Sequence, residues 1–429
     1  MTQQPLTDVF EFPLMQAIFG RRSRRFGLGM QIPSGPLTYA STAAPRPLSE
    51  LEQSVLVAAG TGVSGWTFGI PFGPQQPDQH AAFTQRFTGR TAPTAAGIGT
   101  PVLFYTDDDG TYLTNTRDAR PRRVRELDGE TDGVDEIINA CREHTVRVSA
   151  ERLDLPTAPG HLLEPNLWMA NAPGSTLFLP VGDASEQFLG FLSLMVGNGY
   201  LVIDDDAGRP AGDLEPFIRS GLLDEAKRFP LSVVQQNAYE ANCLETAFMA
   251  HNLVLTMQAM GLGGLYFSGF NRWSVLGAMA ADGIAGLGFR FVIDERWTVP
   301  NPVGLDGHYE GLCPPYYPDM RAAVEAFVAR KFGPAGAYNP EDPAGPWQRA
   351  GEVKATVKPY SPEFVDCLSE IAQYVYAKHG KFPGSITTMV LPGIVQAQHI
   401  DTDFYDTHYQ PGAYLDTHAH HLERWHPDG

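Results

Sequence analysis

The sequence predicts an α+β protein in which a mixed sheet is flanked by helices. Two strand candidates, 176–180 and 200–203, lie on either side of a helix expected at about 184–195, and this alternation is typical of a layered structure. A hairpin is predicted over 101–116, because two strand-like segments flank the turn sequence Asp-Asp-Asp-Gly. The segment 244–260 is apolar nearly all round, so we expect a helix that is buried on several sides or within an oligomer.

The first half of the chain offers clear helix boundaries. A short apolar helix is expected over 8–20. The next helix begins after Ser49, a suitable N-cap, with Glu50 and Glu52 in the first turn, where the helix dipole favours anions. An amphipathic helix is expected over 133–152.

The second half is predicted from the end of the long apolar helix onward. Gly261 is placed as the C-terminal cap of that helix, and strands are expected over 265–267 and 289–293. Further helices are expected near 319–331 and 361–379, among loops rich in Pro, Gly and Tyr.

The change of composition near residue 301 suggests a division of the chain. We expect a core over 1–300, with the hairpin region of about 90–130 inserted in it. A C-terminal extension over 301–429, rich in Pro, Gly, Tyr and His, would pack on the core or on a partner subunit.

The charge balance excludes one class of partner. The chain has 31 Lys and Arg against 49 Asp and Glu, a net charge of -18, whereas a protein that binds duplex nucleic acid normally carries a basic face. A local group of arginines at 117–125 is interpreted as a solvated loop. We therefore expect no nucleic-acid partner.

Targeting signals are also missing from the sequence. The first 19 residues lack the basic and continuous apolar parts of a signal peptide, and no stretch approaches the roughly 18 apolar residues of a membrane span. The four cysteines lie far apart without a CxxC pair, which is poor material for disulfides or a thiolate zinc site. We expect a cytoplasmic protein with no membrane partner.

Two distant segments together suggest an anion site. Arg21-Arg22-Ser23-Arg24-Arg25 concentrates four cations in five residues, and Gly261-Leu262-Gly263-Gly264 follows directly after the apolar helix. The planar fork of arginine grips phosphate oxygens, and glycine lets backbone N–H groups approach a ligand closely. The phosphate of flavin mononucleotide (FMN) is the anion that fits both segments best.

These segments resemble motifs of the nitroreductase-like family of flavin enzymes. Residues 21–26 look like the family's R-R-S-x-R-x-F signature, and 259–270 looks like A-x-x-L-G-L-G followed by G-F. Val63-Ser64-Gly65-Trp66 stands where the family often has P-S-x-x-N-x-Q-P-W. The resemblance covers about 15–70 and 240–295, under half of the chain, and it implies a nitroreductase-like mixed sheet.

The resemblance also implies a cofactor and a set of site residues. Arg21, Arg22, Ser23 and Arg25 would contact the phosphate, the ribityl chain and the pyrimidine edge of FMN. Ser64 and Gly65 would line the edge of the flavin ring. Ser268 and Gly269 would pass backbone groups near the ring, and Gly263 and Gly264 would shape that turn. Family members are usually dimers that bind FMN between subunits, so we expect a homodimer.

The activity expected from this resemblance is FMN-dependent reduction of a small organic acceptor of the nitro, quinone or enone type, with NADH or NADPH as electron donor. Catalytic side chains are not assigned. Gly65-Trp66-Thr67-Phe68 replaces the family's Asn-Gln-Pro-Trp, which leaves the substrate and the nicotinamide site open. A flavin-binding protein that sequesters the cofactor without turnover is an alternative.

The tail 399–426 holds six of the chain's twelve histidines, together with Asp401, Asp403 and Asp406. These are metal-ligand residue types, and a metal-dependent enzyme centred on the tail is a further alternative. Because no HExxH-like pattern is present and aromatic residues lie between the histidines, we expect the tail to pack on the core or a partner, and we assign no metal ligands.

Overall fold

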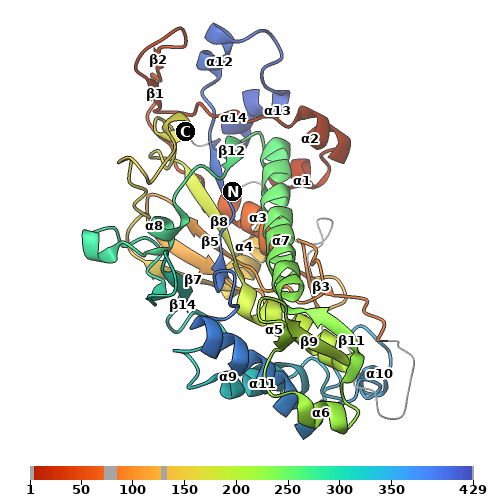
Figure 1. Cartoon of the computed structure of the whole chain (residues 1–429). Coiled ribbons are helices and arrows are strands. Elements are labelled where there is room, and N and C mark those ends of the chain that lie inside the picture. Colours follow the sequence, from red (N-terminus) through yellow and green to blue (C-terminus); the bar gives the residue numbers. More distant parts are fainter. Residues whose placement is uncertain (1–3, 72–84, 127–132, 428–429) are drawn as a thin grey trace.

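The computed structural model describes residues 4–71, 85–126 and 133–427, and it confirms an α+β architecture (Figure 1). The largest sheet is antiparallel, with strand order β12-β17-β8-β5-β6-β7 and with β16 paired to β8 beside this path. Its strands are β5 (Val102–Thr106), β6 (Thr111–Thr114), β7 (Thr145–Ser149), β8 (Thr176–Asp183), β12 (Gly263–Phe267), β16 (Met389–Val390) and β17 (Ile394–Gln398).

The two faces of this sheet are covered differently. Successive side chains of a strand point to opposite faces, so Leu103 and Tyr105 of β5 pack with helices α3 (Glu50–Thr61) and α7 (Leu231–Met260), whereas Val102 and Phe104 pack with the loops on the other face. Both faces of the sheet are therefore buried, which explains why the sequences of β5 and β8 are almost continuously apolar.

Helix α7 (Leu231–Met260) is longer than the predicted 244–260. Its first part carries polar residues, so the spacing of apolar residues in the sequence did not predict that this part is helical. Two of them are buried with specific partners: Gln235 Oε1 accepts from Ser385 N at 2.7 Å, and Asn242 Oδ1 accepts from Thr100 Oγ1 at 3.2 Å. Gly261 caps the helix in a left-handed conformation with φ 84°, as predicted.

Several other boundaries differ from the predictions for local reasons. The expected helix over 8–20 is two helices, α1 (Gln4–Phe10) and α2 (Leu14–Gly20), because Pro13 cannot donate a helical hydrogen bond and starts the second. The expected helix over 133–152 ends early as α4 (Val134–Glu143), since the β-branched residues that follow pair with β6. Helix α3 (Glu50–Thr61) confirms the cap at Ser49.

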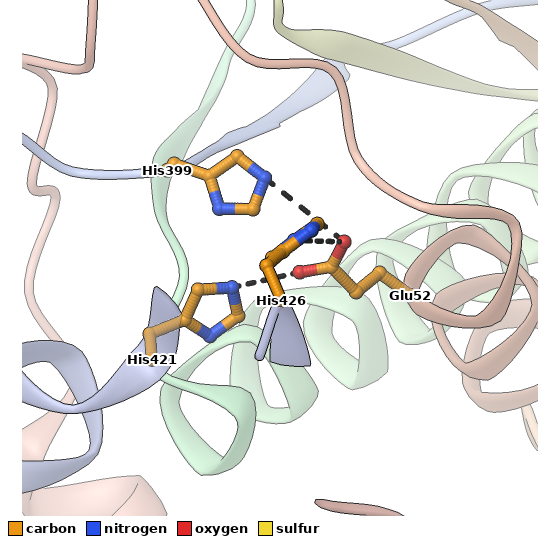
Figure 2. Close-up of side chains that lie close together, drawn as sticks. All are labelled: Glu52, His399, His421 and His426. Carbon is orange, nitrogen blue, oxygen red and sulfur yellow. Dashed lines mark hydrogen bonds and ion pairs between the residues drawn. The ribbon is translucent and has the colours of Figure 1, made fainter. Parts of the chain in front are cut away.

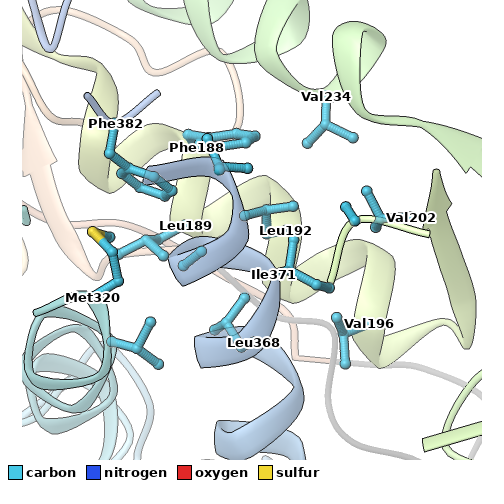
Figure 3. Packing of buried hydrophobic residues seen from close by; sticks show 14 of the residues in the cluster. Phe188, Leu189, Leu192, Val196, Val202, Val234, Met320, Leu368, Ile371 and Phe382 are labelled. Atoms are coloured by element: carbon cyan, nitrogen blue, oxygen red, sulfur yellow. The ribbon is translucent and has the colours of Figure 1, made fainter. Parts of the chain in front are cut away.

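The end of the molecule opposite the tail is a helical layer. Helices α5 (Ala184–Gly197), α9 (Met320–Phe332) and α11 (Pro362–His379) form it close to the predicted positions, and Figure 3 shows side chains such as Phe188, Leu192 and Ile371 packed between them. A small sheet β10-β9-β11, in which β9 and β11 run parallel, lies beside it. Its strands are β9 (Tyr200–Asp204), β10 (Arg209–Pro210) and β11 (Asp224–Pro230).

Short elements complete the described chain. They are β1 (Gln31–Ile32), β2 (Tyr39–Ala40), β3 (Val63–Trp66), β4 (Thr88–Arg90), α6 (Glu215–Arg219), α8 (Arg272–Leu276), β13 (Arg290–Val292), β14 (Asn301–Leu305), β15 (Tyr309–Glu310) and α10 (Ala350–Lys354). None of the helices in the described ranges is long and apolar enough to cross a membrane.

The residues after 301 contribute to both halves of this fold. Strand β17 lies between β12 and β8, and α9 and α11 belong to the helical layer. The tail forms α12 (Thr402–His408), α13 (Asp416–Ala419) and α14 (His421–Trp425) (Figure 1). Helices α2 and α13 contact α7, α14 follows α13 at the C-terminal end of α7, and α12 packs against Tyr39 of β2. The division into a core and an extension at residue 301 stays a prediction.

Candidate functional site at the C-terminal end of α7

The arginine-rich loop and the glycine turn, about 240 residues apart in sequence, lie side by side in the structure. Gly264 N donates to Arg24 O at 2.7 Å, and the two residues form an isolated antiparallel bridge. A Cβ on Gly263 would lie 2.7 Å from Arg24 O, and one on Gly264 (φ 134°) would lie 1.8 Å from Gln396 O. Glycine is required at both positions because backbone passes on two sides.

Arg24 fixes this contact from the inside. Its side chain is buried, and it donates from Nη1 to Gln258 Oε1 at 2.7 Å, from Nε to Ala413 O at 2.9 Å and from Nη2 to Gly20 O at 3.2 Å. Burial lowers the pKa of Arg24. The guanidinium therefore joins the loop, α7 and the tail, and it is already occupied by protein acceptors.

The remaining polar residues of the loop face outward. Arg21, Arg22, Ser23 and Arg25 are exposed, and Arg22 Nη1 donates to the backbone oxygens of Phe19 and Arg21 at 3.0 and 2.7 Å. The structure thus brings the predicted residues Arg21, Arg22, Ser23 and Arg25 together with Gly263 and Gly264.

The other predicted site residues lie elsewhere in the chain. Ser64 and Gly65 belong to β3, which follows the C-terminal end of α3. A 12-residue helix is about 18 Å long, so the two residues lie about that far from the N-terminal end of α3, which is the end near this site. Ser268 and Gly269 follow the far end of β12, and Gly269 O accepts from Leu163 N at 3.0 Å. Within one chain they do not join the arginine loop.

The histidine-rich tail brings a second group of side chains to the same end of α7. His399 follows β17, while His421 and His426 lie at the two ends of α14, and all three rings surround the carboxylate of Glu52 from α3 (Figure 2). His421 Nε2 lies 2.7 Å from Glu52 Oε1, and His426 Nε2 lies 3.1 Å from Glu52 Oε2. His399 Nε2 lies 4.0 Å from Glu52 Oε2.

Backbone groups orient this cluster from outside. Glu52 Oε2 accepts from Ser49 N at 2.6 Å, which is half of the capping box that begins α3. His421 Nδ1 lies 2.7 Å from Met260 O, and His399 Nε2 lies 3.3 Å from Pro47 O. Ser49 N and Pro47 O lie at the start of α3, and Met260 O lies at the end of α7. The ends of these two helices therefore position the side chains of the cluster.

Burial controls the charges in the cluster. Glu52 has no exposed surface, and its desolvation acts to raise its pKa, but hydrogen bonds with His421 and His426 hold the Glu52 pKa well below its usual range. Burial lowers the pKa of His399 to about 4, so its ring is neutral at pH 7. The cluster thus consists of an ionised carboxylate facing imidazole nitrogens, which is a donor set that can hold a metal ion.

The sequence does not predict this cluster, because Glu52 reads only as an acid in the first turn of its helix and no spacing within the tail connects it to the histidines. Asp401 and Asp406 are used differently: Asp401 caps α12 by accepting from Phe404 N at 3.2 Å, and Asp406 accepts from Tyr414 Oη at 2.9 Å. His420 is exposed and lies beside Glu423. The tail packs onto the core, as one of the predictions for it stated.

A small cavity of about 130 Å³ adjoins the cluster. Its lining includes Gly261, His399, His418 and His421, so it touches both the glycine turn and two of the clustered rings. Burial lowers the pKa of His418 to about 3.

Comparisons with known proteins add one distant likeness. No protein-family model matches the chain, and no curated protein does. Among solved structures, one chain provisionally named a nitroreductase, from Ralstonia eutropha JMP134, is 14% identical, with a TM-score of 0.30 over 64% of this chain and 76% of that chain. A likeness of this strength carries no weight for function, and the α+β fold rests on the chain's own sheets and helices.

Proposed function

We propose that this chain is an FMN-dependent oxidoreductase that uses NADH or NADPH to reduce a small organic acceptor. The observation that carries the proposal is the contact between the arginine loop and the glycine strand, where Gly264 N donates to Arg24 O at 2.7 Å. This contact presents Arg21, Arg22, Ser23 and Arg25 beside Gly263 at the end of a buried helix, which is the arrangement that the sequence resemblance implies.

The exposed loop fits the phosphate of FMN. Three guanidinium groups, those of Arg21, Arg22 and Arg25, are accessible on a backbone that Arg24 holds in place from below. A dianionic phosphate is bound most strongly by charge-assisted hydrogen bonds from such forked donors. In a chain of net charge -18, this concentration of cations favours an anionic ligand.

The ring of FMN needs contacts that one copy of the chain does not gather at the loop. Ser64, Gly65, Ser268 and Gly269 would have to come from a second copy, in keeping with the homodimer that the resemblance implies. Helix α2, which leads directly into the loop, exposes apolar side chains: Leu14 is 63% exposed, Met15 54% and Phe19 71%. Apolar surface beside the loop suits such an interface.

When bound, FMN would supply two-electron transfer between the nicotinamide and an acceptor of the nitro, quinone or enone type. This chain's own residues would bind and orient it. Arg22 and Arg25 would attract negative charge on the phosphate or the pyrimidine edge, and Gly263 and Gly264 would let backbone approach closely.

The test is the visible spectrum of the purified chain, followed by titration of the flavin-free protein with FMN. A yellow, roughly stoichiometric chromophore is expected. Arg25→Ala should weaken FMN binding about 10-fold or more, since a hydrogen bond to a charged group contributes about 1.5–3 kcal/mol. Arg349→Ala, which removes an exposed arginine at the start of α10, is the matched control and should bind as the parent does.

Absence of FMN binding even after addition of the cofactor would refute the proposal. If FMN binds, anaerobic NADH and NADPH separate the two flavin hypotheses: bleaching of the chromophore supports an oxidoreductase, and an oxidised spectrum with both donors supports a sequestering protein.

A further inference from the structure

Both ring nitrogens of His421 face acceptor oxygens. Its Nδ1 lies 2.7 Å from Met260 O and its Nε2 lies 2.7 Å from Glu52 Oε1. Two states of the ring fit these contacts: an imidazolium that donates through both nitrogens, or a neutral imidazole that donates from Nδ1 to Met260 O and binds a divalent cation through Nε2. The second state would place the cation between Nε2 and the carboxylate.

The other rings point to the same conclusion. His399 is buried, and its Nδ1 has no hydrogen-bond partner among the described residues. His426 Nε2 and His399 Nε2 lie 3.1 and 4.0 Å from the same carboxylate oxygen of Glu52. One carboxylate needs only one cationic partner to balance its charge. Three imidazoles and a carboxylate around a common point can together serve as the ligands of a metal ion.

The distances suit a tetrahedral ion. One ligand atom from each of Glu52, His399, His421 and His426 lies within 4.8 Å of all the others. Bonds of about 2.0–2.1 Å to nitrogen and oxygen in a tetrahedral zinc site place the ligand atoms about 3.3 Å apart.

Outer contacts of the kind that metal sites use are already in place. Ser49 N donates to Glu52 Oε2, and Met260 O lies opposite the Nε2 of His421. Such partners fix the tautomer and the orientation of ligating rings and carboxylates. Three nitrogen ligands and one oxygen favour zinc over magnesium or calcium, which prefer oxygen ligands.

We propose that Glu52, His399, His421 and His426 form a closed zinc site that fastens the C-terminal tail to the ends of α3 and α7. Glu52, His399 and His421 are at most 3% exposed, and His426 is 16% exposed at the edge. Four protein ligands without an open position are typical of a structural zinc site. The site lies on the inner side of the arginine loop and does not depend on flavin binding.

The experiment uses the full chain without an affinity tag of histidines. The protein is stripped with a chelator, reloaded with Zn²⁺, passed through gel filtration and measured for metal by mass spectrometry. One zinc per chain is expected, together with a higher melting temperature than the stripped protein has. Co²⁺ loading should give the intense visible absorption of a four-coordinate ion.

Variants identify the ligands. Glu52→Gln and His426→Ala should each weaken Zn²⁺ binding by more than about 100-fold, beyond the 10–100-fold loss typical of outer partners. His420→Ala is the matched control, because it removes an exposed histidine next to His421. Circular dichroism of the metal-free variants establishes that they fold, and His426→Ala, at the edge of the site, is the variant expected to fold best.

Retention of less than one tenth of an equivalent of zinc by the parent chain would overturn the proposal, and so would full retention by both ligand variants. Equal losses in the His420→Ala control would also overturn it, since they would show binding to surface histidines. FMN content is measured on the same samples, so loss of zinc with flavin binding intact, or the reverse, separates this proposal from the oxidoreductase.

Discussion

Replacement of Gly264 by alanine tests the contact on which the candidate site depends. Gly264 has φ 134°, a conformation that side-chain-bearing residues rarely adopt, and an added Cβ would lie 1.8 Å from Gln396 O and 2.6 Å from Met257 Cε. The first of these atoms is backbone of the neighbouring strand β17, so it cannot rotate away. Relief of the clash requires displacement of β12 relative to β17, which disturbs the contact of Gly264 with Arg24 on the other edge of β12.

The expected cost combines two physical effects. A non-glycine residue held in a rare backbone conformation costs about 1–3 kcal/mol. Overpacking in a filled interior adds about 1–3 kcal/mol. We therefore expect Gly264→Ala to lower the free energy of unfolding by about 2–6 kcal/mol, a large part of the 5–15 kcal/mol that is usual for a domain.

The assay is urea unfolding followed by tryptophan fluorescence and circular dichroism. Gly221→Ala is the matched control, because Gly221 also has positive φ, 85°, but an added Cβ there meets nothing within 4 Å. It should cost only the conformational part, about 1–2 kcal/mol. If Gly264→Ala is no more destabilising than Gly221→Ala, the close approach of β17 and the arginine loop at Gly264 is wrong.

Two further perturbations test other parts of the structure. Ser49→Ala removes the hydroxyl that accepts from Glu52 N at 3.3 Å, and it should lower the free energy of unfolding in urea by about 1 kcal/mol. Zinc binding should persist, because the backbone N–H of residue 49 still donates to Glu52. An unchanged unfolding midpoint would contradict the role of Ser49 as a cap. Lys331 is buried beside Tyr360 Oη, and desolvation lowers its pKa to about 7. The unfolded lysine binds its proton up to a pKa of about 10.4, so between these values the unfolded state holds the extra proton and the contribution of Lys331 to the free energy of unfolding should rise from pH 7 to pH 10. Lys331→Met should reduce that rise and stabilise the protein at pH 7, and an identical pH slope in the variant would refute this assignment.

Much of the fold could be predicted because its signals are local. The turn Asp107–Gly110 joins β5 to β6, Ser49 caps α3, and Gly261 ends α7, each through contacts within a few residues. The errors occur where a distant partner decides the structure. Residues 231–243 are helical because loops from other parts of the chain satisfy their buried polar groups, and 145–149 is a strand because β6 lies beside it.

The candidate site divides in the same way. The sequence alone indicated that the cations of residues 21–25 and the glycines of 263–264 belong together, since arginine and glycine are suited to one kind of ligand. It did not indicate that Arg24 would be the buried member that holds the loop, because that depends on Gln258 and Ala413, which lie far away in the chain.

Only the tertiary structure decided the role of Glu52 and the tail. By sequence, Glu52 is a first-turn acid of a capped helix, and His399, His421 and His426 are members of a histidine-rich segment about 350 residues later. Their meeting requires β17 to pair within the central sheet and α14 to pack against the end of α7. Local sequence determines caps and turns because their energies arise between near neighbours, whereas this cluster of charge and imidazole exists only after packing has removed Glu52, His399 and His421 from water.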